Sequence, residues 1–222
     1  MSRQLILPFA LHESSTFERF VVGPNEELVD RLRRPGGGFD CIWLFGESGV
    51  GKTHLLQALC HAEPGASYIP AREIGADSVL DGYARFDVVT VDEVHRWLGS
   101  REQELALMGL YNRLSARRAR LVLTANRSPL DVAFAVADLA SRLRAAACYR
   151  VAPLHDEDKV RLLVNAGKDR GLTLAPDVVR FLLLRVSREQ QELLRILDQL
   201  DRSSLAVHRR ITIPFVKETL CL

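Results

Sequence analysis

Gly46-Glu47-Ser48-Gly49-Val50-Gly51-Lys52-Thr53 fits every fixed position of the phosphate-binding pattern G-x-x-x-x-G-K-[ST], and this stretch decides which fold we expect. Its glycines allow successive backbone N–H groups to turn inward around a diphosphate. Lys52 places a positive charge near the β- and γ-phosphates, and the Thr53 hydroxyl is suited to a magnesium ion. We therefore predict that this loop binds a nucleotide.

The residues on either side of the loop favour the order strand, loop, helix. Residues 41–45 form an apolar run of strand length, and residues 54–59 have apolar side chains at helical spacing. A helix that starts at the loop adds its partial positive charge beneath the phosphates. The alternative is a glycine-rich turn without a ligand, and the flanking pattern argues against it.

Composition limits the class of protein. The 222 residues are 47% hydrophobic and 26% charged, as in an ordinary globular protein with one large or two small domains. The net charge of +2 gives no overall case for nucleic-acid binding, although residues 101–150 carry nine arginines against four acidic residues, so we expect one face to be basic. No cysteine pair has zinc-site spacing, and no apolar stretch is long enough for a membrane span or resembles a signal peptide. We expect a cytoplasmic protein.

Alternating strands and helices predict an α/β fold. We expect a helix over residues 26–34, strands over 67–69, 87–91, 121–124 and 148–151, and intervening helices such as 102–117. Together with the strand before the loop, this order implies a parallel five-stranded sheet flanked by helices.

Beyond Pro153 the pattern becomes helical. We expect helices over residues 155–170, from Pro176, and around the apolar positions from Leu193 to Leu200, then a short strand at 210–213 and a helix from Pro214. The expected organisation is an N-terminal arm (1–13), a nucleotide-binding α/β domain (14–153) and a small helical lid domain (154–222).

Two acidic residues follow an apolar strand, as in a Walker B segment. Asp92 and Glu93 come directly after Val88-Val89-Thr90-Val91. Asp92 is expected to hold Mg²⁺ through water or through the Thr53 hydroxyl, and Glu93 to activate the attacking water. The alternative is a turn with two solvated acids.

Two further polar residues are candidates for catalysis. Asn126 follows the strand at 121–124, so it can position a water at the carboxyl edge of the sheet, or instead cap a helix that begins at Pro129. Arg142 precedes the last strand and can act in trans, as an arginine finger in a neighbouring protein's site, or be an ordinary solvated arginine.

These segments together resemble the AAA+ ATPases of the DnaA family, and within them the Hda regulators. Residues 16–23 are similar to the adenine-side segment of DnaA, and residues 123–129 to its sensor 1 loop. Residues 4–9, 138–143, 154–159, 197–202 and 212–218 look like Hda segments in the same order. The resemblance implies that Val21 and Val22 contact the adenine side of bound ADP or ATP, that ADP is the working ligand, and that Asn126 is the sensor 1 residue.

The N-terminal arm is similar to peptides that bind the replicative sliding clamp, the β subunit of DNA polymerase III. In Gln4-Leu5-Ile6-Leu7-Pro8-Phe9, Gln4 offers an amide, Leu7 and Phe9 can enter an apolar groove, and Pro8 limits the entropy lost on docking. The alternative is an ordinary N-terminal strand. The resemblance implies that clamp binding includes Leu5 and that contact with DNA is mainly indirect, through the clamp.

The sequence also departs from the family pattern. Gln191 stands where DnaA-like lid helices carry a nucleotide-sensing arginine, and Arg188 or Arg195 on the same helical face could substitute for it. Lys52, Thr53, Asp92 and Glu93 are all present, whereas Hda proteins can have an eroded loop and Walker B pair. Intrinsic ATP hydrolysis therefore remains open.

Four hypotheses follow. The first is a regulatory inactivator that is anchored to the clamp and uses Arg142 to promote ATP hydrolysis in DnaA, which prevents re-initiation of replication. The second is a self-contained ATPase or loader acting as a homo-oligomer. The third is an adaptor that tethers DnaA to the clamp without accelerating hydrolysis. The fourth, and weakest, is direct DNA binding through an arginine group, Arg113, Arg117, Arg118 and Arg120.

Overall fold

The computed structural model describes residues 9–34, 37–75, 80–207 and 210–222, which form two compact units. The first unit comprises Met1–Phe20, Asn25–Glu47 and Gly51–Ala152, and the second comprises Val21–Pro24, Ser48–Val50 and Pro153–Leu222. Two short pieces near the expected nucleotide site, Val21–Pro24 and Ser48–Val50, thus cluster with the C-terminal unit. No helix within these described ranges is long and apolar enough to cross a membrane.

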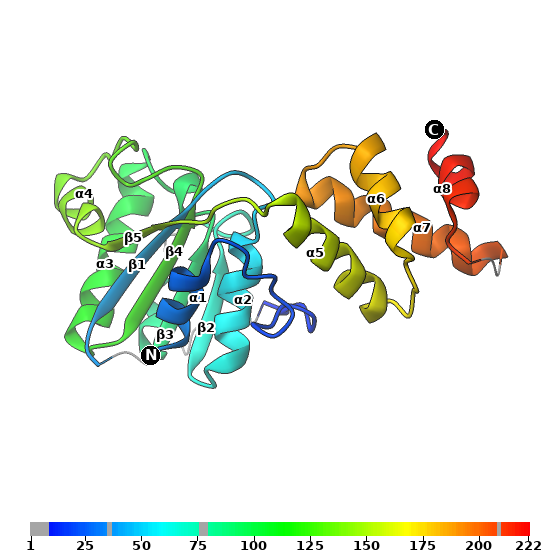
Figure 1. The fold of residues 1–222 in the computed structure, drawn as a ribbon. Coiled ribbons are helices and arrows are strands. Elements are labelled where there is room, and N and C mark those ends of the chain that lie inside the picture. The colour runs from blue at the N-terminus through cyan, green and yellow to red at the C-terminus, as the bar shows by residue number, and fades with distance from the viewer. Residues whose placement is uncertain (1–8, 35–36, 76–79, 208–209) are drawn as a thin grey trace. The chain divides into compact units, whose positions relative to one another are not determined.

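The first unit contains a parallel five-stranded sheet, as the alternation of strands and helices predicts (Figure 1). The strand order is β2-β3-β4-β1-β5, and each neighbouring pair is parallel. The elements are α1 (Glu26–Arg33), β1 (Asp40–Phe45), α2 (Lys52–Ala62), β2 (Ala66–Pro70), η1 (Leu80–Arg85), β3 (Val88–Asp92), η2 (Val94–Arg96), α3 (Arg101–Ala116), β4 (Arg120–Ala125), α4 (Ala137–Arg144) and β5 (Ala147–Arg150).

Alternation along the strands divides the sheet into two faces. Trp43, Val89, Val91 and other odd-numbered strand residues join one apolar cluster with Leu107 on α3 and Leu139 on α4. Because successive side chains of a strand point to opposite faces, the even-numbered residues face the other way. Helix α2 contacts β2, β3 and β4 on that other face (Figure 1). This face therefore holds the polar ends of β3 and β4.

The chain between β4 and α4 differs from one of the expectations. Residues 126–136 contain bends and turns, and the next helix begins only at Ala137. A helix starting at Pro129 is therefore wrong, and Asn126 does not cap one. Glu104 of α3 gives a physical reason, because its buried carboxylate accepts hydrogen bonds from the backbone N–H groups of Ala135 and Val136. These hydrogen bonds hold the backbone of Ala135 and Val136 against α3, so the segment before α4 is not helical.

The second unit contains α5 (Asp156–Asp169), α6 (Pro176–Arg185), α7 (Gln190–Val207) and α8 (Ile213–Leu220). Its core includes Leu193, Ile196, Leu197 and Leu200, as the helical spacing predicts. The short strand expected at 210–213 is wrong. Thr212 is the N-cap of α8, its side chain accepts a hydrogen bond from the Phe215 N–H, and Pro214 lies in the first turn, so this segment starts a helix.

Candidate nucleotide-binding site

The phosphate-binding pattern lies between β1 and α2, with Lys52 as the first residue of the helix. Gly51 has a φ of +99°, and a Cβ added there would lie 2.8 Å from Cε2 of Phe20. The position therefore requires glycine for both its backbone conformation and its neighbour. The Lys52 ammonium donates hydrogen bonds to the carbonyls of Gly46 and Glu47, at 2.8 and 2.6 Å, and partial burial lowers its pKa. The positive charge of Lys52 therefore lies beside the first two residues of the loop.

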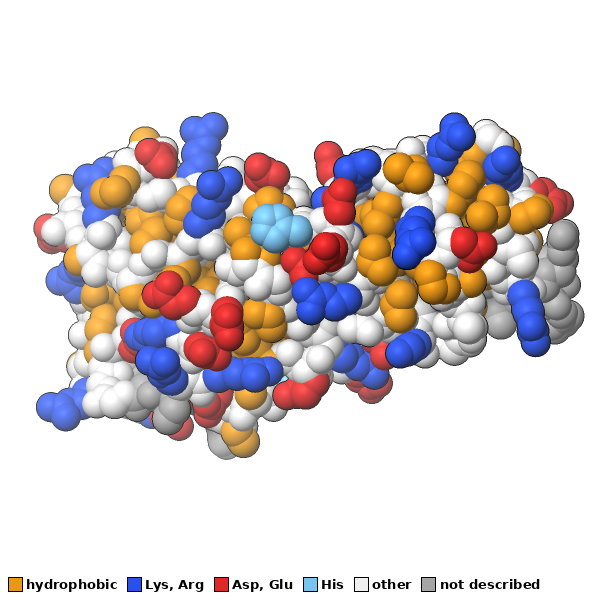
Figure 2. Space-filling view, viewed as in Figure 1, with side chains coloured by type: hydrophobic (Ala, Val, Ile, Leu, Met, Phe, Trp, Pro, Cys, Tyr) orange, Lys and Arg blue, Asp and Glu red, His pale blue; other side chains and the backbone are white. Residues whose placement is uncertain are grey.

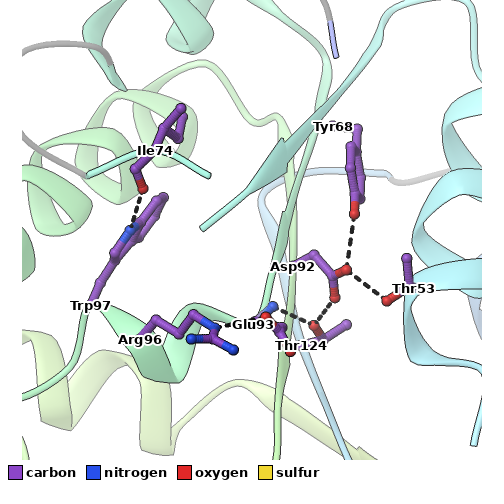
Figure 3. Close-up of polar contacts among 8 residues, drawn as sticks. All are labelled: Thr53, Tyr68, Ile74, Asp92, Glu93, Arg96, Trp97 and Thr124. Atoms are coloured by element: carbon purple, nitrogen blue, oxygen red, sulfur yellow. Dashed lines mark hydrogen bonds and ion pairs between the residues drawn. The ribbon is translucent and has the colours of Figure 1, made fainter. Parts of the chain in front are cut away.

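Asp92 is the centre of a hydrogen-bonded group (Figure 3). Its Oδ2 accepts from the Thr53 hydroxyl at 2.7 Å and from the Tyr68 hydroxyl at 2.9 Å, and its Oδ1 accepts from the Thr124 hydroxyl at 2.5 Å. Burial is the main reason why the pKa of Tyr68 is raised, and the Asp92 carboxylate adds to the shift. Both carboxylate oxygens thus have hydroxyl partners from three different elements.

The donor set fits a magnesium ion. Mg²⁺ prefers hard oxygen ligands and is commonly held by a carboxylate and a phosphate-loop hydroxyl together with its own waters. Thr53 and Asp92, which we expected to share the metal from their sequence positions alone, lie in direct contact. The residues that could hold the ion are therefore Thr53 and Asp92, with Tyr68 and Thr124 behind the carboxylate.

Glu93 has a different environment from its neighbour Asp92. It adopts a left-handed backbone conformation with a φ of +56°, and its backbone N–H donates to the Thr124 hydroxyl at 2.8 Å. Its Oε2 accepts from Arg96 Nε at 2.7 Å, and both side chains are partly exposed (Figure 3). The carboxylate expected to activate water is thus paired with an arginine three residues later.

A pocket of about 420 Å³ opens beside these carboxylates. Its lining includes Thr53, Asp92 and Glu93, together with Tyr68 from β2. The N-terminal segment contributes as well, because Phe9, Ala10 and His12 line the same pocket. Phe9, which we assigned to clamp binding, therefore lines the same pocket as Thr53 and Asp92.

Helix α2 holds the N-terminal segment through three side chains. Gln57 Oε1 accepts from the His12 N–H at 3.1 Å. The His61 ring contacts the His12 carbonyl at 3.1 Å, and the His54 ring contacts the Thr16 carbonyl at 2.8 Å. These contacts join the segment to the helix that begins with Lys52 and Thr53.

Arg142 lies on α4 and contacts α3. Its guanidinium carbon is 5.4 Å from the centre of the Tyr111 ring, and its Nη1 donates to the Asn112 side chain. The Tyr111 ring in turn packs edge-on against Phe39, with 4.8 Å between ring centres. The guanidinium is thus supported on one side by an ordered aromatic pair, while the arginine keeps part of its surface exposed. Asn126 is exposed immediately after β4.

The other expected site residues are distributed as follows. Val21 and Val22 are partly exposed and belong to the second unit. On the lid helices, Arg188 pairs with Asp156 and Arg195 with Glu192. Both arginines therefore have acidic partners within their own unit. Gln4, Leu5, Leu7 and Pro8 lie outside the described residues.

Three of the four arginines considered for direct DNA binding have partners within the first unit, and the fourth, Arg118, is exposed. Arg120 is buried and donates to the carbonyls of Leu32 and Arg31, so its role is structural. Arg113 pairs with Asp81, and Arg117 donates to the Ala84 carbonyl. On the face of the first unit that Figure 2 shows, basic and acidic side chains are interspersed.

Sequence reasoning missed four residues of this site: Tyr68, Gln57, Thr124 and Arg96. Tyr68 is paired in register with Thr90, two residues before Asp92, and therefore points to the α2 face. Tyr68 and Thr124 share one weak signal, a hydroxyl in a predicted strand, and Gln57 has another, a polar residue between apolar ones on a predicted helix. Arg96 carries no local pattern.

Three family models match parts of the chain. The model described as "Hda, lid domain" matches residues 156–220, and that of the bacterial DnaA ATPase domain matches residues 11–67. A model described as "RNA helicase" matches residues 42–118. The lid match falls entirely on helices α5 to α8 and the DnaA match contains the phosphate-binding loop, so the two ends of the chain point to related proteins.

Several solved structures have a similar fold. Domain III of the replication initiation protein DnaA from Thermotoga maritima has a TM-score of 0.82 and 20% identity, and the match covers 96% of this chain and 98% of that chain. AMPPCP-bound DnaA from Aquifex aeolicus has a TM-score of 0.70 and 21% identity, with 89% and 69% covered. The RuvB branch migration motor of Thermotoga maritima has a TM-score of 0.64 and 17% identity, with 82% and 61% covered.

Proposed function

We propose that this chain, whose two ends match models of the bacterial DnaA ATPase domain and the Hda lid domain, is a regulatory inactivator of the initiator DnaA. In this role it binds a nucleotide, docks on ATP-bound DnaA, and promotes hydrolysis of the ATP that DnaA holds. Its N-terminal arm binds the sliding clamp on DNA, so that hydrolysis follows replication. We place this activity in the cytoplasm, where replication takes place.

The nucleotide site acts mainly as a binding site in this proposal. Lys52 and the loop N–H groups hold the phosphates, and Thr53 and Asp92 hold Mg²⁺, which neutralises phosphate charge when bound. The bound AMPPCP of the Aquifex aeolicus DnaA structure supports an adenine nucleotide as the ligand. The pairing of Glu93 with Arg96 supports weak intrinsic turnover, because a carboxylate held by an arginine is less free to accept a proton from water. ADP is proposed as the resident form from the resemblance to the Hda regulators.

The proposal depends mainly on the exposure and the contacts of Arg142. A finger arginine must reach another protein's γ-phosphate, so it has to be presented at the surface in a restricted set of conformations. Arg142 meets this requirement because it is partly exposed and is supported by Tyr111 and Asn112. On docking, it would stabilise the charge that develops on the phosphate oxygens of DnaA-bound ATP.

The test is the rate of DnaA-bound ATP hydrolysis with clamp-loaded DNA. We expect Arg142→Ala to lose nearly all stimulation, since an arginine finger contributes about 10³-fold or more to turnover. Arg144→Ala is the matched control, because Arg144 lies on the same helix and contacts Phe134 and the Pro129 carbonyl. If Arg142→Ala stimulates hydrolysis like the wild type while clamp binding persists, the finger assignment is wrong. If the wild type itself binds the clamp and DnaA without stimulating hydrolysis, the chain is an adaptor.

Clamp binding by the arm is tested separately. We expect Leu7→Ala to abolish binding to the clamp and to leave nucleotide binding intact, since Leu7 is assigned to the clamp's apolar groove. A variant that binds the clamp with wild-type affinity would show that the arm is an ordinary terminal segment.

A second candidate is an ATPase or loader that acts as a homo-oligomer. The direct contact between Thr53 and Asp92 favours it, because the metal-binding pair is intact. This function predicts ATP turnover that rises with protein concentration without DnaA and is lost in Glu93→Gln. Chromatography of the nucleotide released on denaturation adds a further test, since a resident ADP fits the regulator and an empty or ATP-filled site fits the enzyme.

A further inference from the structure

Two hydrogen bonds and one shared pocket connect the N-terminal segment with the expected metal carboxylate. The His12 N–H donates to Gln57 Oε1 at 3.1 Å, and Gln57 lines the same pocket as Tyr68. The Tyr68 hydroxyl then donates to Asp92 Oδ2 at 2.9 Å, the same oxygen that accepts from Thr53. Four residues from the N-terminal segment, α2, β2 and β3 are thereby joined within one unit.

Gln57 lies between the N-terminal segment and Tyr68 in this group of residues. Only 3% of its surface is exposed, although it is a polar residue on a helix whose neighbouring buried residues are apolar. Its amide oxygen accepts from the His12 N–H, and its side chain lines the pocket that also contains Tyr68 and Asp92. A buried polar group that loses its partner is unfavourable, so a displacement at His12 favours a shift of Gln57 within the pocket that it shares with Tyr68.

The pocket beside Asp92 also connects these residues to the N-terminal arm. Phe9 and His12 both line the pocket, as do Tyr68 and Asp92. Phe9 is also the last residue of the segment assigned to clamp binding. A partner that binds Phe9 therefore removes this side chain from the pocket. Because Phe9 is only three residues before His12, the backbone next to the His12 contact is displaced as well.

We propose that Gln57 and Tyr68 couple the N-terminal arm to the magnesium–nucleotide site by positioning the Asp92 carboxylate. Tyr68 is a positioning residue, because it acts on the metal through Asp92. The inference rests on the nucleotide and magnesium binding proposed above. By linkage, arm docking and magnesium–nucleotide binding change each other's affinity by the same factor.

The first test measures the affinity of a fluorescent ADP analogue in Mg²⁺ and in EDTA. We call the ratio of the ADP-analogue affinity in Mg²⁺ to that in EDTA the Mg²⁺ enhancement. Residues that orient metal ligands typically change metal affinity by about 10–100-fold. We therefore expect Tyr68→Phe to reduce the Mg²⁺ enhancement about tenfold and to leave the affinity in EDTA unchanged. Tyr149→Phe, on β5, is the control and retains the full enhancement. Gln57→Leu is a second variant and is expected to act in the same direction as Tyr68→Phe.

The second test addresses the link to the arm. His12→Pro removes the N–H that Gln57 accepts, whereas His12→Ala keeps it, so the pair isolates one backbone hydrogen bond. We expect the Mg²⁺ enhancement to fall severalfold in His12→Pro and to be unchanged in His12→Ala. Equal enhancement in these two variants overturns the coupling, and full enhancement in Tyr68→Phe overturns the positioning role.

These measurements also separate the inference from the proposed function. They use the full chain without DnaA or the clamp, so loss of DnaA stimulation does not affect them. If the wild type shows a full Mg²⁺ enhancement and the variants match it, only the coupling is wrong. If the wild type binds the ADP analogue in neither buffer, the nucleotide binding of the proposed function is contradicted directly.

Discussion

Arg142 of α4 lies over the ring of Tyr111 of α3, with 5.4 Å between the guanidinium carbon and the ring centre. The two helices come from different parts of the sequence, and the ring is itself packed against Phe39. An arginine has many rotamers, and restricting them before docking reduces the entropy lost when a partner binds. The Tyr111 ring is therefore a support for the residue on which the proposed function depends.

The first prediction concerns this support. We expect Tyr111→Leu to lower the stimulation of DnaA-bound ATP hydrolysis about three- to tenfold, because an exposed cation–π contact contributes about 0.5–1 kcal/mol and also orders the arginine. Tyr111→Phe keeps the ring and should retain the stimulation. A higher rate in Tyr111→Leu than in the wild type would mean that the ring restrains Arg142 from its partner.

The second prediction concerns Glu93 and Arg96. Since the Arg96 Nε holds Glu93 Oε2 at 2.7 Å, we expect Arg96→Ala to raise the chain's own ATP turnover severalfold by freeing the carboxylate. A partly exposed ion pair is weak, so the change should be modest. ATPase assays without DnaA measure it, and the double variant with Glu93→Gln should have no turnover. Unchanged or reduced turnover in Arg96→Ala would contradict this interpretation.

The third prediction concerns the stability of the first unit. Glu104 is fully buried and accepts hydrogen bonds from three backbone N–H groups, those of Gly99, Ala135 and Val136. Glu104→Ala leaves these donors without their carboxylate, and we expect it to lower the free energy of unfolding by about 3 kcal/mol or more. Urea unfolding followed by tryptophan fluorescence measures this change, because Trp43 and Trp97 are both buried in this unit.

The matched control for that experiment is Glu102→Ala in the first turn of the same helix. Glu102 is exposed, so its replacement should change stability by less than about 0.5 kcal/mol. If the two alanine variants are equally stable, the carboxylate of Glu104 does not hold the segment before α4.

The fourth prediction concerns pH. Burial lowers the pKa of His54, and the hydrogen bond to the Thr16 carbonyl opposes this shift to a smaller extent. A histidine whose folded pKa lies below its unfolded value contributes stability above the unfolded pKa of about 6.5, and this stability is lost as the pH falls through the folded pKa. We therefore expect the melting temperature to fall between pH 7.5 and 5.5.

His54→Gln identifies the residue responsible. The melting temperature of this variant should fall less over the same pH range, although His95, whose pKa burial also lowers, keeps part of the dependence. An equal fall in the variant and the wild type would show that other groups account for the acid sensitivity.

Periodicity and motif spacing were sufficient for the sheet. The strands at 67–69, 87–91, 121–124 and 148–151 all correspond to strands of the structure. The central strands β3 and β4 are buried apolar runs that sequence alone reveals, whereas the edge strands β2 and β5 are only partly buried. The segments at 126–136 and 210–213 were predicted less well. Their structure depends on the distant Glu104 carboxylate in one case and on a helix cap in the other.

The sequence by itself determined the strand, loop and helix around residues 46–53, the proximity of Thr53 and Asp92, and the α/β core with its helical second unit. These follow from local spacing and from the carboxyl ends of parallel strands meeting at one edge. Only the tertiary structure decided that Tyr68 and Thr124 contact Asp92, that Arg96 pairs with Glu93, and that Gln57 holds the N-terminal segment through His12. The reason is that most of these contacts join residues far apart in sequence, and such hydrogen bonds leave no periodic pattern in the chain.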